Sequence, residues 1–159
     1  MIFVKALVIY YSRTGITEEL AHDIADRVGG DIEKIDDGKQ RKGLLGFIKS
    51  GWDSFIENKP EINQLQHDVS QYDIVIIGTP IWAGNISAPV RSFITSYRDE
   101  LNKVAFFCTF AASGSDNALN NMQVLTGKMP ESKLSLRKKE IISGTHPLEV
   151  QEFIEGFTE

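Results

Sequence analysis

The sequence predicts a doubly wound α/β fold, in which helices cover both faces of a parallel sheet. Short apolar runs typical of buried strands, such as residues 74–77, alternate along the chain with segments whose apolar residues recur at helical spacing. Glycine, proline and hydroxylated residues separate these segments. With 159 residues, 42% of them hydrophobic, the chain is long enough for one core, and we expect a single domain over residues 1–159.

The first expected strand, residues 6–11, leads through a tight turn into a helix that ends at Gly29. Three hydroxyls, one guanidinium and one glycine lie in this turn, which consists of Ser12, Arg13, Thr14, Gly15, Ile16 and Thr17. A glycine lets the main chain approach an anion closely, and hydroxyls together with the free N–H groups of a helix start bind phosphate. The alternative interpretation is that Ser12 or Thr14 only caps the helix and that Gly15 only serves the turn.

Residues 31–36 alternate apolar and charged side chains, which predicts a short edge strand. The next segment, residues 38–60, is an expected insertion. Its apolar residues recur at helical spacing, which predicts an amphipathic helix from about Leu44 to Asn58, and Pro60 ends the pattern. Five basic and two acidic residues lie between Lys39 and Lys59, although the whole chain has a formal net charge of −5.

The β-branched run of residues 74–77 predicts a strand buried on both faces at the centre of a parallel sheet. A loop over residues 78–85 follows, and then a helix over about residues 88–98 with Pro89 in its first turn. The loop contains Trp82. Two interpretations of this tryptophan are open: it packs against the neighbouring helix, or it forms a flat wall for a planar ligand.

Residues 104–109 predict a further buried strand, in which Cys108 is expected to behave as a small apolar residue. A loop of small residues follows up to Asp116, and a helix is expected over about residues 117–126. We expect a last strand over residues 134–142, with its charged half, residues 137–140, outside the sheet. A closing helix is expected over residues 148–157.

Composition narrows the class of protein. The apolar N-terminus is too short to span a bilayer, and a net charge of −5 argues against a nucleic-acid-binding protein. A single cysteine excludes an internal disulfide and suits a reducing compartment, so a cytoplasmic location is expected. Three scattered histidines show no metal-binding spacing, so no metal site is expected.

In doubly wound folds, ligands bind outside the carboxyl ends of the central strands. Three of the expected loops lie there, so one ligand can contact all of them. Besides residues 12–17, the candidate binding residues are Pro80, Ile81, Trp82, Ala83, Gly84 and Asn85 of the second loop, and Thr109, Phe110, Ala111, Ser113 and Gly114 of the third.

These residues resemble the flavodoxin family over nearly the whole chain. The family's phosphate loop, (Ser/Thr)-x-Thr-Gly-x-Thr, matches residues 12–17, and residues 79–85 followed by Pro89, Val90 and Phe93 resemble the loop that carries an aromatic stacked on the isoalloxazine ring. The resemblance implies a five-stranded sheet in the order 2-1-3-4-5, with non-covalently bound FMN. Its phosphate would lie on the first loop and its ring between the other two, with Trp82 stacked on it. The implied function is electron transfer between a reductase and an acceptor protein.

The chain also departs from the family. The third loop lacks the familiar tyrosine, and Phe110 is its only aromatic residue, so the second flavin face is open or covered by Trp52 or Phe55. Flavodoxins are acidic around the flavin, whereas residues 79–85 contain no carboxylate, which leaves the choice of redox partner open. Two alternative functions remain: an NAD(P)H-dependent FMN or quinone reductase, and a non-redox interaction module with an empty crevice.

Overall fold

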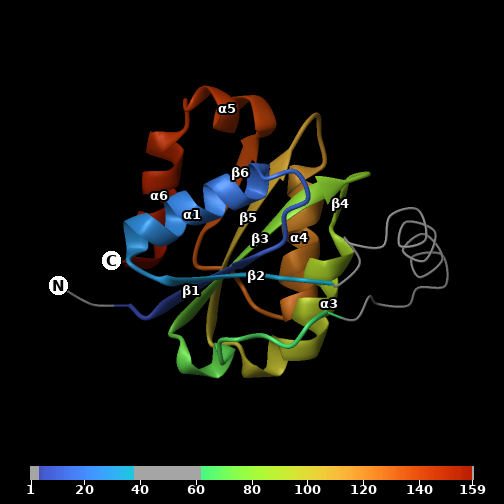
Figure 1. Ribbon diagram of the computed structural model, residues 1–159, viewed down its shortest axis with the longest axis vertical. Helices are drawn as coiled ribbons and strands as arrows, with labels where there is room; N and C mark the ends of the chain where they lie inside the picture. Colours follow the sequence, from blue (N-terminus) through green and yellow to red (C-terminus); the bar gives the residue numbers. More distant parts are fainter. Residues whose placement is uncertain (1–3, 38–61, 159) are drawn as a thin grey trace.

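The computed structural model describes residues 4–37 and 62–158. Within them, parallel strands form a sheet in the order β2-β1-β3-β5-β6, and a short β4 pairs antiparallel with β3. Counted along the parallel strands alone, this is the predicted order 2-1-3-4-5 (Figure 1). The strands are β1 (Ala6–Tyr10), β2 (Asp31–Lys34), β3 (Ile74–Trp82), β4 (Asn85–Ile86), β5 (Lys103–Phe110) and β6 (Lys133–Arg137).

Helices cover both faces of the sheet, as a doubly wound fold requires (Figure 1). They are α1 (Ile16–Val28), α3 (Ala88–Tyr97), α4 (Ser115–Thr126), α5 (Lys138–Ser143) and α6 (Pro147–Thr158), with 3-10 turns at Val69–Gln71 and Arg98–Glu100. The core has two halves, one on each face of the sheet. In one half, α3 and α4 pack against strand side chains such as Leu7 and Ile77. In the other, α1, α5 and α6 pack against strand side chains such as Val8 and Ile76. Because both faces are covered, all five residues of β1 are buried.

Two expectations about the elements were wrong. The last strand ends at Arg137, which still pairs within the sheet. Residues 138–140 lie outside the sheet as expected, but they begin α5 instead of interrupting a strand, because Lys138, Lys139 and Glu140 favour helix and only Ile141 of the next two residues is buried. The expected loop 78–85 is mostly strand: β3 runs on to Trp82 and turns into β4. The predicted amphipathic helix, residues 44–58, lies outside the described residues.

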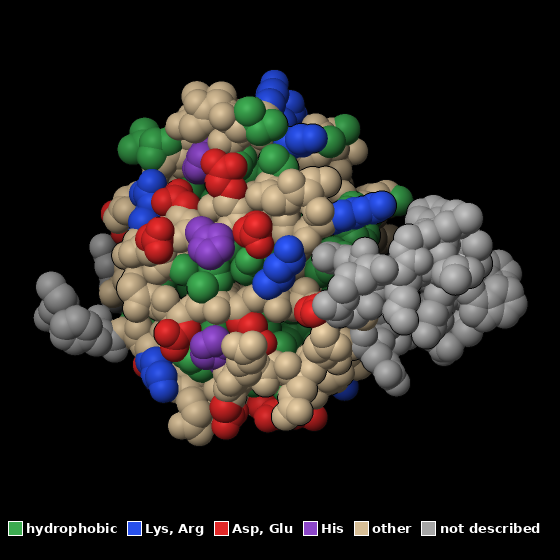
Figure 2. All heavy atoms as spheres, in the orientation of Figure 1, with side chains coloured by type: hydrophobic (Ala, Val, Ile, Leu, Met, Phe, Trp, Pro, Cys, Tyr) green, Lys and Arg blue, Asp and Glu red, His purple; other side chains and the backbone are tan. Residues whose placement is uncertain are grey.

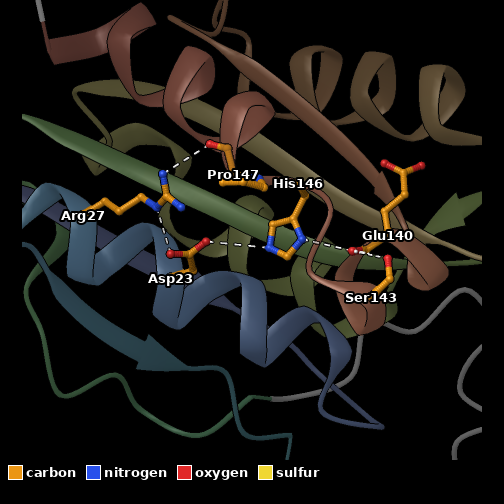
Figure 3. Close-up of polar contacts among 6 residues, drawn as sticks. All are labelled: Asp23, Arg27, Glu140, Ser143, His146 and Pro147. Carbon is orange, nitrogen blue, oxygen red and sulfur yellow. Dashed lines mark hydrogen bonds and ion pairs between the residues drawn. The ribbon is translucent and has the colours of Figure 1, made fainter.

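A polar cluster fastens the connection between α5 and α6 to α1 (Figure 3). The Arg27 guanidinium donates to Asp23 Oδ1 (2.9 Å) and to the Pro147 carbonyl (3.3 Å). His146 lies between α1 and α5. Its Nε2 is 3.8 Å from Asp23 Oδ2, and its Nδ1 is 3.1 Å from the Glu140 carbonyl oxygen. These contacts hold the short helix α5 in place at the carboxyl end of β6.

The lone cysteine behaves as predicted. Cys108 is fully buried in β5, and burial, with a smaller contribution from the charge of Asp116, raises the pKa of its thiol to about 12. In residues 4–37 and 62–158, no helix is long and apolar enough to cross a membrane, and no cluster of three or more His, Cys, Asp or Glu side chains is arranged to hold a metal ion.

Gly78 in β3 lies directly under the ring of Phe107, which a Cβ atom at this position would overlap. We expect Gly78→Ala to lower the free energy of unfolding by about 1–3 kcal/mol, because a tightly packed core accommodates an added methyl only by shifting its neighbours. Urea denaturation measures the effect. The double variant Gly78→Ala/Phe107→Leu should recover part of the loss, and an unchanged stability of the single variant would contradict this packing.

Candidate functional site

Three loops meet at the carboxyl edge of the sheet, and each touches the other two. The first and third are joined by the hydroxyls of Thr17 and Thr109, 2.8 Å apart. The first and second meet at Trp82, whose ring centroid lies 5.9 Å from the guanidinium of Arg13 and whose ring meets that of Tyr11, just before the first loop, edge-on with centroids 5.6 Å apart. The second and third approach each other at Gly84 and Gly114, where a Cβ on Gly114 would lie 2.8 Å from Gly84 Cα. The predicted convergence of the three loops is therefore present.

In the first loop, Gly15 precedes α1 with φ 93° and no side chain caps the helix start, so the helix-cap interpretation of Ser12 and Thr14 does not hold. Ser12 is buried and its Oγ accepts the Gly15 N–H (3.1 Å), which leaves the hydroxyl proton of Ser12 available to a ligand. The first N–H groups of a helix have no partner within it, so this start offers donors to an anion. Thr14 is exposed beside them.

Thr17 and Thr109 are both buried, and their mutual hydrogen bond uses one of their two hydroxyl protons. The other proton remains free to be donated. The sequence predicted that Thr17 contacts a ligand directly, whereas the structure gives it a second task, because it ties the start of α1 to the end of β5. Ile16 is only partly buried and packs against the core on the α1 face of the sheet.

The second loop is a two-residue hairpin turn. Trp82 pairs with Asn85, and the residues between them, Ala83 and Gly84, have φ of 51° and 79°. Positive φ at both central positions is what a type I′ turn requires, and it suits the twist of the flanking strands. Pro80 and Ile81 lie in β3 just before the turn and are partly buried. Trp82 is 37% exposed, so its ring is only partly covered by the protein.

The third loop connects β5 to α4. Phe110 is partly buried, Ala111 and Ser113 are exposed, and Gly114, with φ 101°, precedes an α4 start that no side chain caps. Two asparagines of α4 hold the hairpin turn: Asn117 Nδ2 donates to the Gly84 carbonyl (2.9 Å), and Asn121 Nδ2 donates to Asn85 Oδ1 (3.0 Å). Sequence reasoning missed both asparagines, although their spacing of four residues places them on one helix face.

The charges around the loops are asymmetric. The Arg13 guanidinium lies 5.9 Å from the centroid of the Trp82 ring, and the Arg137 guanidinium lies 5.8 Å from that of Phe110. Residues 12–17 and 79–85 contain no carboxylate. The nearest acid on α1, Glu18, accepts the Tyr10 hydroxyl proton (2.8 Å) and lies 3.5 Å from Lys34; the Tyr10 hydrogen bond and the Lys34 charge lower its pKa. Sequence reasoning also missed Arg137.

These features define an α/β protein in which three loops converge at the carboxyl edge of a doubly wound sheet. A family model described as Flavodoxin matches residues 5–155. The chain therefore belongs to the flavodoxin family.

Solved structures share this fold. A flavoprotein from Lactobacillus acidophilus, crystallised in complex with FMN, is similar with a TM-score of 0.69 and 20% identity, over 89% of this chain and 97% of that one. The two-electron reduced flavodoxin of Megasphaera elsdenii has a TM-score of 0.61 and 19% identity, over 95% and 96% of the two chains.

A curated relative, an NAD(P)H dehydrogenase (quinone) from Cupriavidus metallidurans, is 26% identical over 90 residues. The aligned part is 57% of this chain and 45% of that relative, so the similarity covers less than half of the dehydrogenase.

Ala83 is the only residue other than glycine with positive φ in the described part of the chain. Asparagine tolerates this backbone region better than alanine, so we expect Ala83→Asn to raise the free energy of unfolding by about 0.5–1 kcal/mol. The control is Ala111→Asn, an exposed site in the neighbouring loop without positive φ, where stability should stay within about 0.5 kcal/mol. Equal effects of the two substitutions in urea denaturation would contradict the turn geometry.

Proposed function

We propose that this chain binds FMN non-covalently in the crevice between its three loops and carries electrons between partner proteins. The observation that supports this most is the convergence, at one edge, of a helix start without a side-chain cap and a partly exposed tryptophan. The first suits a phosphate and the second suits a planar ring. The fold shared with a flavoprotein crystallised in complex with FMN supports the same assignment.

The first loop would hold the phosphate. Its donors are the free N–H groups at the start of α1, the remaining proton of Ser12 and the exposed hydroxyl of Thr14. The positive end of the α1 dipole favours a dianion here, and residues 12–17 contain no carboxylate to repel it. The residues present therefore fit the phosphate of FMN.

The second and third loops would hold the ring. Trp82 offers a partly exposed aromatic face, and the close approach of the Gly84 and Gly114 backbones joins the two loops. Asn117 and Asn121 keep the hairpin turn of Trp82 in position. When bound, FMN supplies a ring that takes up and releases electrons reversibly. The protein orients this ring and leaves one edge of the crevice open to a partner.

Thr14→Ala tests the phosphate assignment with little risk to the fold, because Thr14 is exposed, whereas Thr17 is buried and bonded to Thr109. Losing a hydrogen bond to a charged group costs about 1.5–3 kcal/mol, so FMN affinity should fall about tenfold or more in calorimetry.

Riboflavin, which lacks the phosphate, is the matched ligand. Wild type should bind it far more weakly than FMN, and Thr14→Ala should leave riboflavin affinity unchanged. If Thr14→Ala binds FMN as tightly as wild type, Thr14 does not hold the phosphate.

A second candidate function is an NAD(P)H-dependent quinone reductase, which the similarity to the Cupriavidus dehydrogenase favours. The sequence contains no second dinucleotide-binding fingerprint. We therefore expect the FMN-loaded protein to be reduced by dithionite but to oxidise NADH or NADPH only when a separate reductase is added. Steady-state quinone reduction by NAD(P)H above about 1 s⁻¹, without any added reductase, would identify a reductase instead.

A further inference from the structure

Two buried hydroxyls lie side by side where the first loop meets the third. Thr17 and Thr109 are 2% and 5% exposed, and their Oγ1 atoms are 2.8 Å apart. The hydrogen bond between them uses one of their two hydroxyl protons. In residues 4–37 and 62–158, neither hydroxyl makes any other hydrogen bond. Because buried donors normally have an acceptor, the remaining proton indicates an acceptor that is not part of the described chain.

The position of Thr17 explains why the helix itself does not use its proton. Three other helical threonines, Thr95, Thr126 and Thr158, each donate to the carbonyl four residues earlier. Thr17 is the second residue of α1, so the residue four places before it, Arg13, lies outside the helix. No helical carbonyl is therefore available to Thr17, which lies on the turn of α1 whose N–H groups are also free.

The direction of the bond between the two threonines decides which of them presents the free proton. When Thr109 donates, the free proton belongs to Thr17 at the start of α1; when Thr17 donates, it belongs to Thr109 in β5. A phosphate at the start of α1, as proposed above, is the stronger acceptor, because hydrogen bonds to charged groups are about twice as strong as neutral ones. The phosphate then takes the Thr17 proton, and Thr109 has to donate to Thr17.

Well-directed donors matter here because the overall charge of the protein does not attract a phosphate. The formal net charge is −5, and Figure 2 shows acidic and basic side chains interspersed on the face that α1 crosses. Selection of a dianion therefore rests on the local donors of the first loop. A hydroxyl that accepts one hydrogen bond is polarised and donates a stronger one. A bond donated by Thr109 thus makes Thr17 a better donor to phosphate.

We propose that Thr109 is a positioning residue for the phosphate: it donates its proton to Thr17 Oγ1 and so turns the Thr17 proton toward the phosphate. This inference rests on the proposed function and assigns part of its specificity, the preference for a phosphorylated over an unphosphorylated flavin. It also changes the role of Thr109. The sequence placed this residue in a loop that holds the ring, whereas here it serves the phosphate through a residue 92 positions earlier.

Thr109→Val keeps the shape of the side chain and removes its hydroxyl. We expect calorimetry to show an FMN affinity about tenfold lower and a riboflavin affinity equal to that of wild type, since riboflavin has no phosphate. Thr109→Ala, which also lacks the hydroxyl, should give the same loss, and Thr109→Ser, which retains it, should bind FMN like wild type. Equal losses for FMN and riboflavin would place Thr109 at the ring and overturn the proposal, as would unchanged FMN affinity.

A double-variant cycle tests whether Thr109 acts through Thr17. In a Thr17→Val background, Thr109→Val should cause no further loss of FMN affinity, because the donor that it directs is already gone. Additive losses would contradict the proposal. Thr126→Val is the matched control for loss of a buried threonine hydroxyl, since Thr126 is 5% exposed and donates to the Met122 carbonyl within α4. It should lower stability but leave the preference for FMN over riboflavin unchanged.

Inorganic phosphate is a probe that needs no FMN, so it separates failure of this inference from failure of the proposed function. At constant ionic strength, phosphate should raise the Tm of wild type, because a ligand of the folded state stabilises it. Thr109→Val should lose most of that rise, while Thr109→Ser and the control Thr126→Val should keep it. An equal rise in Thr109→Val would overturn the inference even if FMN binds. If the rise depends on Thr109 but FMN does not bind, the proposed function fails and the role of Thr109 stands.

Discussion

The close approach of Gly84 and Gly114 is the contact on which the geometry of the crevice depends. β3 and β5 are neighbours in the sheet, so the connections that leave their carboxyl ends compete for the same space. A Cβ on Gly114 would lie 2.8 Å from Gly84 Cα, and Gly114 has φ 101°, so at this position only glycine satisfies spacing and conformation together. This approach lets Asn117 reach the Gly84 carbonyl and fixes the turn that carries Trp82.

The crevice is polar because two helices begin there without a side-chain cap. α1 follows Gly15 and α4 follows Gly114, and neither start has a side-chain acceptor for its free N–H groups. A glycine at the N-cap costs only about a few tenths of a kcal/mol relative to a capping side chain, so the chain forgoes little stability at these two adjacent places. The bond between Thr17 and Thr109 joins these two regions and keeps their donors together. An anionic group is the natural acceptor for such a set.

Much of this arrangement was predictable from local pattern. The apolar runs located the buried strands, and alternation with helical periodicity indicated a doubly wound sheet with loops at one edge. The errors came where local pattern is ambiguous. Residues 138–142 follow a strand and include Ile141 and Ile142, which favoured a longer strand. They form part of helix α5 instead, in which Ile141 is buried and Ile142 is 64% exposed. Residues 78–85 are rich in turn-forming residues, which favoured a loop over the whole segment. The strand in fact continues to Trp82, and only Ala83 and Gly84 make the turn.

The sequence by itself determined the order of the elements and the chemistry of the first loop, since burial periodicity and the residues of a helix start are local properties. Only the tertiary structure decided which side chains from distant parts of the chain meet. Three such contacts depend on strand register and on the positions of α4 and α5. They are the hydrogen bond from Asn117 to the hairpin turn, the packing of Arg137 over Phe110, and the hydrogen bond between Thr109 and Thr17. The residue pattern of the sequence gives neither the strand register nor the helix positions. Contacts across a sheet follow from how the strands pair and not from the composition of each strand.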